Sequence, residues 1–281
     1  MVKFSGIDST FTRTQFKDYA DFVRTSISPT YVIATITFIL LFVFYLIGYR
    51  VRQAVIRRNP DQAKLDLKAI NGILLGLLGL LLAFTFGMSN TRYSARRDIM
   101  IHEANAIATA IMRTDLYPDS VKKLLRDNLK EYVELRIAYY EDGTNWEKVL
   151  QDYIESEKVG ERTWHIAVDF AKKDQQTTIA SQLLPAITDM VHVAKSRRAA
   201  GEGTIPDSIV YFLFVLCWCA AFLLGYDHKD KIDWIVVTGF AIMLSATVFN
   251  IMDLDRPRSG LIKLDSVNQK IVELREMFAH D

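Results

Sequence analysis

The residues whose types and spacing could best support a chemical role directly follow a long uncharged run. Arg92 and Arg96 are four residues apart, so a helix would place them on one face. Arginines gathered in this way could concentrate anions near the end of the uncharged run. The alternative is that each arginine forms a structural ion pair with a carboxylate such as Glu103, Asp253 or Asp255. The polar residues that we assign to this charged stretch are Arg92, Arg96, Arg97, Glu103, Asn105 and Arg113.

A second group of charges, the exit motif, follows the last apolar run and comprises Asp253, Asp255, Arg256 and Pro257. The two carboxylates could offer oxygens to a hard cation such as calcium, but such a site takes about 6–8 oxygens. Salt bridges to Arg256 or Arg258 are the alternative. Pro257 disfavours a helical conformation at Arg256 and Gly260 permits a turn, which together predict a sharp exit of the chain from the bilayer.

Catalytic patterns are missing from the sequence. His102 and Glu103 have no second histidine at position 106, so the two-histidine face of a zinc protease is absent. There is also no nucleophile elbow, phosphate-binding loop or dinucleotide fingerprint. Cys217 and Cys219 lie within an apolar run, where they are typical of core or lipid-facing residues. We therefore expect no catalytic residues, no metal and no cofactor.

Composition indicates a chain divided between lipid and water. Of 281 residues, 50% are hydrophobic and 24% are charged, and the net charge of +1 gives no reason to expect a nucleic-acid partner. A helix that crosses the membrane needs about 20 apolar residues. Four runs meet this requirement, at 30–49, 69–89, 206–226 and 234–252.

The connections between these runs predict an all-α membrane protein with its four transmembrane helices in two hairpins. Short polar connections join the first run to the second and the third to the fourth, whereas the intervening segment is too long for a bare loop. We expect an N-terminal amphipathic segment at 1–29, hairpins at 30–89 and 205–255, a helical extramembrane domain at 90–204 and a tail at 256–281.

Apolar periodicity predicts four helices in the extramembrane domain, at 91–116, 118–141, 144–172 and 174–199. In the second of these, apolar residues recur every three or four positions and form one packing stripe. The members of the stripe are Val121, Leu124, Leu125, Leu129, Tyr132, Val133 and Ile137.

The second apolar run is unusual in its glycine spacing. Gly72, Gly76 and Gly79 fall near one helix face, where another backbone could approach closely. In a symmetric assembly, bulky neighbours would form a hydrophobic constriction that gates by dewetting. The alternative is ordinary helix packing in a monomer or dimer. The residues that we assign to the constriction are Ile73, Leu77, Leu81 and Phe84.

Most lysines and arginines near the ends of the runs would lie inside the cell if the N-terminus were cytoplasmic, which favours that orientation. The basic connection at 50–68 conflicts with it. We expect both termini in the cytoplasm and a multi-pass protein of the cell's inner (plasma) membrane.

Several motifs resemble a known family. The stretch LLGLLLAFTFGMSNTRYSARR at 77–97 resembles the second span of bestrophins, a glycine- and leucine-rich helix that leads into an Asn-Thr-x-Tyr stretch. The chain from about 69 to 264 also resembles the bacterial bestrophin-like family. The motifs of this second resemblance are EANAIATAIMRTDLYP at 103–118, the pair Tyr132 and Arg136, LLPAITDM at 183–190, Pro206 and DLDRPRSG at 253–260.

The resemblance to the bacterial bestrophin-like family implies a four-span subunit with cytoplasmic termini. The more distant resemblance to bestrophins implies a homopentameric anion channel. The sequence departs from bestrophins in two ways. Ser94 to Arg97 replace a tryptophan-rich turn, and only Asp253 and Asp255 stand where bestrophins carry a calcium-binding acidic run. Calcium gating is therefore not expected.

Our leading hypothesis is an oligomeric ion channel whose pore is lined by the second run, with inorganic ions such as chloride and the lipid bilayer as partners. We expect a homo-oligomer, with a pentamer as the form that the resemblance implies. The alternative is a non-conducting membrane scaffold or sensor whose helical domain binds a cytosolic partner.

Overall fold

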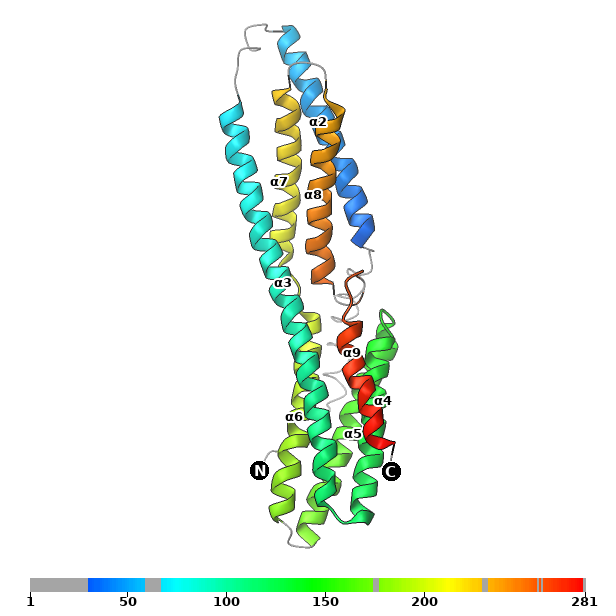
Figure 1. Ribbon diagram of the computed structural model, residues 1–281. Helices are drawn as coiled ribbons and strands as arrows, with labels where there is room; N and C mark the ends of the chain where they lie inside the picture. Colours follow the sequence, from blue (N-terminus) through cyan, green and yellow to red (C-terminus); the bar gives the residue numbers. More distant parts are fainter. Residues whose placement is uncertain are drawn as a thin grey trace, which may run out of the picture. The chain divides into compact units, whose positions relative to one another are not determined.

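The computed structural model describes residues 30–58, 67–173, 177–228, 232–256, 258 and 260–279. Every regular element in these ranges is a helix (Figure 1). The elements are α2 (Thr30–Arg58), α3 (Lys68–Arg113), η2 (Thr114–Leu116), α4 (Asp119–Glu141), α5 (Trp146–Lys173), α6 (Thr177–Glu202), α7 (Asp207–Asp227), α8 (Trp234–Asp255), α9 (Asp265–Val272) and η3 (Glu273–Phe278).

Four helical stretches are long and apolar enough to cross a membrane, which confirms the four predicted apolar helices. Their apolar segments lie in α2, α3, α7 and α8. The described residues divide into two compact units. We call 30–93 with 204–262 the apolar unit, and 94–203 with 263–279 the polar unit. Helix α3 contributes residues to both units.

The apolar unit is held together by a core to which α2, α3, α7 and α8 all contribute. Its fully buried side chains include Leu213, Cys217 and Val248, and Leu41 and Leu78 join them from α2 and α3. Helices α2 and α7 cross at two glycines, Gly48 and Gly225. Each is so close to the facing backbone that a Cβ atom would lie 2.0 Å from a carbonyl oxygen. Small residues at a crossing allow this kind of contact in membrane helices.

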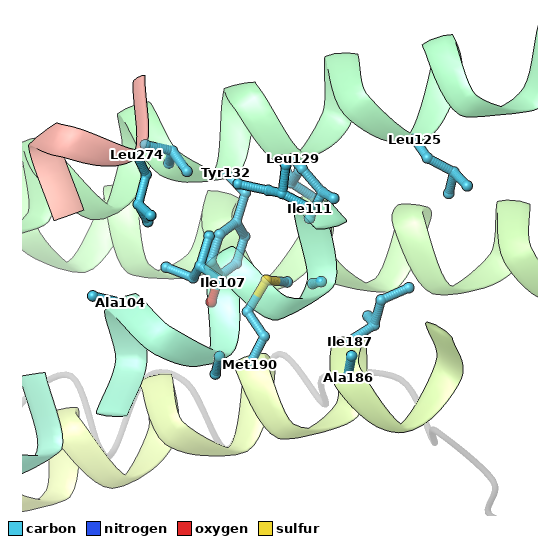
Figure 2. Packing of buried hydrophobic residues seen from close by; sticks show 14 of the residues in the cluster. Ala104, Ile107, Ile111, Leu125, Leu129, Tyr132, Ala186, Ile187, Met190 and Leu274 are labelled. Atoms are coloured by element: carbon cyan, nitrogen blue, oxygen red, sulfur yellow. The ribbon is translucent and has the colours of Figure 1, made fainter. Parts of the chain in front are cut away.

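The polar unit has a separate hydrophobic core, built from α4, α5, α6, the polar end of α3 and the C-terminal helices (Figure 2). The observed α4, α5 and α6 lie within three residues of the predicted helices at 118–141, 144–172 and 174–199. The stripe on α4 is largely buried, but Leu124 is exposed. The buried members of the stripe are Leu125, Leu129, Tyr132, Val133 and Ile137.

The C-terminal helices α9 and η3 are docked on α4. The Tyr140 hydroxyl donates to Asp265 Oδ1 at 2.7 Å and accepts from the backbone N–H of Leu264 at 3.1 Å. The Arg275 guanidinium binds both carboxylate oxygens of Glu134. Ile271, Leu274 and Phe278 complete the hydrophobic core. The sequence pattern predicts only a tail at 256–281.

Candidate functional site

One side of α3 in the apolar unit is left uncovered by the other residues that the structure describes. Ile73 is 74% exposed, Leu77 46% and Phe84 63%. The fourth residue assigned to the constriction, Leu81, packs partly against the core of the apolar unit. Its neighbour Leu80 is exposed instead. The exposed apolar residues thus follow the helical spacing 73, 77, 80 and 84, which places them on one stripe.

Glycines lie on the same open side of α3. A Cβ atom built on Gly72, Gly76, Gly79 or Gly87 would meet no described atom within 4 Å. The described part of this chain therefore leaves these glycines free for close approach by another helix. Whether the bulky stripe lines a pore stays a prediction.

The residues of the charged stretch occupy different environments. Arg96 is buried, Arg92 is half-buried and Arg97 is exposed. Asn105 is exposed, and Arg113 donates from Nη1 to the backbone oxygen of Gln182 on α6. An anion-attracting role for these side chains stays a prediction.

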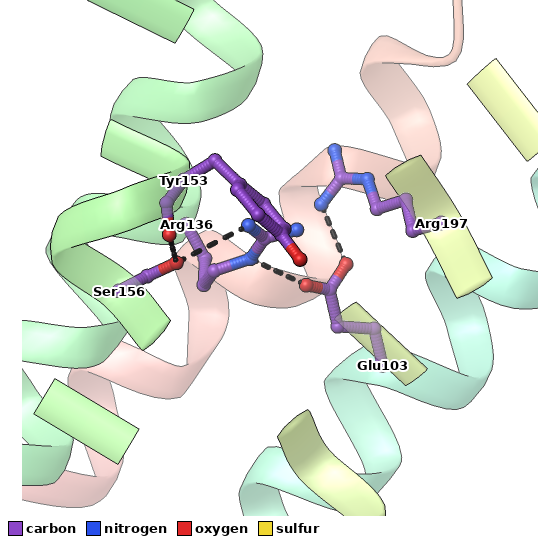
Figure 3. A network of polar contacts seen from close by, with 5 residues as sticks. All are labelled: Glu103, Arg136, Tyr153, Ser156 and Arg197. Carbon is purple, nitrogen blue, oxygen red and sulfur yellow. Dashed lines mark hydrogen bonds and ion pairs between the residues drawn. The ribbon is translucent and has the colours of Figure 1, made fainter. Parts of the chain in front are cut away.

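Glu103 lies fully buried inside the polar unit, between two arginines (Figure 3). Arg136 of α4 donates from Nε to Glu103 Oε1, and Arg197 of α6 donates from Nη1 to Oε2, both at 2.6 Å. Burial alone would raise the pKa of Glu103, but the charges of Arg136 and Arg197 together lower it. Glu103 is therefore an ionised structural link between α3, α4 and α6.

Aromatic and hydroxyl groups complete this network. The Arg136 guanidinium lies over the ring of Tyr139, 4.4 Å from its centroid, and Arg197 lies 5.3 Å from the same ring. Ser156 on α5 accepts from Arg136 Nη1 at 3.5 Å and donates to the backbone oxygen of Tyr153 at 2.7 Å. Guanidinium groups over aromatic faces gain cation–π energy where little water is present.

Arg136, Arg197 and Ser156 are not among the site residues predicted from the sequence. Arg136 falls between Val133 and Ile137 on the apolar stripe of α4. A charged residue within a buried stripe requires a buried partner. That signal could have identified Arg136, although not its partner.

The carboxylates of the exit motif bind backbone amides. Asp253 is buried and accepts from the N–H groups of Leu261 at 2.9 Å and Ile262 at 2.8 Å. Asp255 accepts from Ile205 N–H at 3.0 Å. Helix α8 ends at Asp255; the exit from the bilayer at this point stays a prediction. Pro257 lies outside the described residues.

The turn beyond α8 depends on a glycine. A Cβ atom on Gly260 would lie 2.9 Å from the backbone oxygen of Asp253 and 3.0 Å from its carboxylate. A side chain there would push the 260–262 segment away from Asp253. In the part of the chain that the structure describes, no group of three His, Cys, Asp or Glu residues could hold a metal ion.

A pair of carboxyl groups in the polar unit gives a pH-dependent prediction. Burial and then a hydrogen bond with Asp142 raise the pKa of Asp152 from 3.8 to about 6. The folded state therefore binds more protons than the unfolded state within this window, and the free energy of unfolding falls as the pH rises through it. We expect Asp152→Asn to stabilise the protein at pH 7 by about 1 kcal/mol, after allowance for solvent screening.

Thermal unfolding of the detergent-purified protein from pH 4 to pH 7 measures this effect. Asp127→Asn, which removes an exposed carboxylate from α4, is the matched control and should leave the pH dependence unchanged. An unchanged slope in Asp152→Asn would contradict the raised pKa.

Four helices that are long and apolar enough to cross a membrane indicate a multi-pass membrane protein. The family model of the bestrophin-like domain matches residues 32–268, so the chain belongs to the bestrophin-like family. No curated protein matches the chain.

Solved structures with a similar fold come from Klebsiella pneumoniae. A bacterial bestrophin homologue with a tryptophan-to-alanine mutation has a TM-score of 0.68 and 11% sequence identity, over 90% of this chain and 99% of that one. A structure of such a homologue solved by zinc phasing has a TM-score of 0.64 and 11% identity, over 87% and 98% of the two chains. At this identity, the likeness concerns the fold alone.

Proposed function

We propose that the chain is the subunit of an oligomeric ion channel whose pore is lined by α3. The observation that carries this proposal is the apolar stripe of Ile73, Leu77, Leu80 and Phe84, which the described part of the chain leaves uncovered. A ring of such side chains around a symmetry axis would exclude water until the ring widens. Leu81, which is also predicted for the constriction, would then pack between the stripe and the core of the apolar unit.

The glycines of α3 support assembly through this helix. In lipid, helices associate largely by close packing, because lipid tails are as apolar as leucine. Gly72, Gly76 and Gly79 would let a neighbouring copy approach α3 closely on the side next to the stripe. A homo-oligomer would place the apolar stripe around a shared axis and the glycines of α3 against a neighbouring copy. By analogy with bestrophins, we propose a pentamer.

The family also supports anions as the permeant ions. Arg97 is exposed in the charged stretch that follows the stripe, and Arg92 is partly exposed. Positive charge at a pore mouth raises the local anion concentration. We propose inorganic anions such as chloride as substrates, with Arg92 and Arg97 as the residues that set the preference.

The topology that accompanies this function has α2–α3 and α7–α8 as consecutive transmembrane hairpins, with α2 packed on α7 of the second hairpin. The polar unit would then be the cytoplasmic domain, with both termini on the same side of the inner (plasma) membrane. The lysines and arginines near the ends of the spans favour this orientation.

A scaffold or sensor is the second candidate, and one observation favours it. Met112, Leu116 and Leu124 are large apolar side chains exposed where α3 leads through η2 into α4. Exposed apolar groups on a water-facing domain mark a contact for a protein partner. In this alternative the spans anchor the chain without conducting.

Phe84→Ala should raise the current of the purified protein in planar bilayers severalfold, because a smaller side chain widens an apolar constriction and favours its hydration. Phe212→Ala is the matched control. It removes a similarly exposed phenylalanine from α7 and should leave the current unchanged.

If a well-folded oligomer carries no current, the scaffold or sensor function is favoured. A stable monomer in detergent, measured by mass, would exclude a shared pore. An equal change in both variants would contradict the assignment of α3 as the pore helix.

A further inference from the structure

The interior of the polar unit carries an excess of positive charge. Arg136 and Glu103 have no exposed surface and Arg197 is 7% exposed, so two guanidinium groups share one carboxylate. The nearby carboxylate of Glu157 lies 3.4 Å from the ammonium group of Lys195, which balances its charge. A net charge inside a protein is strongly destabilising unless a counter-charge compensates it.

Two buried hydrogen-bond donors close to this charge lack acceptors. Arg136 Nη2 and the Tyr132 hydroxyl are both buried, and neither has a hydrogen-bond partner among the described residues. Tyr132 and Arg136 are four residues apart on α4, so their side chains leave the same face of the helix. Figure 2 shows the Tyr132 ring extending from α4 toward Ile107 on α3, the helix that also carries Glu103.

Electrostatics connect these two donors. Burial is the largest factor that raises the pKa of Tyr132. The charges of Glu103 and Glu157 raise it further, whereas those of Arg136 and Arg197 lower it. The Tyr132 hydroxyl therefore stays protonated and available as a donor. Ser156, fixed by its bond to the backbone of Tyr153, accepts from Arg136 Nη1 and not from Nη2 (Figure 3).

We propose that the polar unit binds one small monovalent anion, of halide size, between Arg136 Nη2 and the Tyr132 hydroxyl. An anion would accept hydrogen bonds from both groups and would also cancel the excess charge of the two arginines. A water molecule could accept the same hydrogen bonds but would leave the charge uncompensated. A cation is excluded by the guanidinium groups. This site lies among side chains of α3, α4, α5 and α6, and is separate from the stripe proposed to line the pore.

Chloride should stabilise the full-length protein in detergent when it replaces gluconate at constant ionic strength. Gluconate serves as the reference because it is too large for an enclosed site. Above the dissociation constant, each tenfold increase in chloride should raise the Tm by about 2–4 °C. Bromide should act in the same way, and its anomalous scattering should give a peak within hydrogen-bond distance of Arg136 Nη2 in crystals of the full chain.

Tyr132→Phe removes only the proposed donor and should flatten the dependence of Tm on chloride. Tyr117→Phe is the matched control, because Tyr117 is also buried with a hydroxyl that has no partner among the described residues, but it packs against Phe170 rather than the arginines. Tyr117→Phe should respond to chloride like the wild type.

Three results would overturn the proposal: a Tm independent of halide, a halide response that survives in Tyr132→Phe, and crystals soaked in bromide without a peak at Arg136. Because the bromide experiment uses the wild-type protein, it decides the question even if Tyr132→Phe fails to fold. A halide bound in a pore would stabilise both tyrosine variants equally, so the two sites are distinguishable.

Discussion

Glu103→Gln should reduce the free energy of unfolding by about 3–5 kcal/mol. The substitution preserves the size of the side chain and removes the carboxylate that binds both Arg136 and Arg197. Two buried guanidinium groups would then lie close together with no carboxylate between them. Thermal or SDS-induced unfolding of the purified protein, followed by circular dichroism, measures the loss.

Glu134→Gln provides the control for Glu103→Gln. Glu134 also binds an arginine through its carboxylate, but both partners are about half exposed. Solvent screens such pairs, so the expected cost is within about 1 kcal/mol. A Glu103→Gln variant as stable as Glu134→Gln would show that the buried arginines are compensated by another group.

A triple variant separates the charge effect from the loss of hydrogen bonds. Glu103→Leu, Arg136→Met and Arg197→Met together remove every charge of the network and keep its volume. Because the desolvation of buried charges is costly, this variant should be more stable than Glu103→Gln alone. If it is less stable, the hydrogen bonds of the network matter more than its charges.

The four apolar helices were predictable because the tendency of a long uncharged run to lie in lipid is a local property of the sequence. Helices α4 and α5 were predictable from apolar periodicity for the same reason. The assignment of faces was less certain. Leu80 and Leu81 are adjacent and chemically identical, and only the packing of α3 shows that Leu80 is the exposed one.

Partners that are distant in the sequence could not be predicted. Glu103 binds arginines that are 33 and 94 residues away, and Arg275 binds Glu134 across 141 residues. No spacing rule links such positions in one sequence. The exit motif illustrates the same limit, because the acceptor role of Asp253 depends on a turn that brings Leu261 and Ile262 back to it.

Gly225→Ala should prevent the observed packing of α2 against α7. The added methyl group would lie 2.0 Å from the backbone oxygen of Tyr45 and 2.8 Å from its carbonyl carbon. Backbone atoms cannot rotate away as a flexible side chain can, so the two helices must separate. Overpacking typically costs about 1–3 kcal/mol, and we expect the upper end or more because both contacts are with the main chain.

Gly48→Ala tests the same crossing from the opposite helix, because its methyl group would lie 2.0 Å from the backbone oxygen of Phe222. The two substitutions should therefore lower the yield and the Tm of the detergent-purified protein to a similar degree. Gly239→Ala in α8 is the matched control, since no described atom lies within 4 Å of the added carbon. It should keep or slightly raise stability, because alanine favours a helix more than glycine does. If Gly48→Ala and Gly225→Ala resembled Gly239→Ala, α2 and α7 would have to pack differently in the membrane.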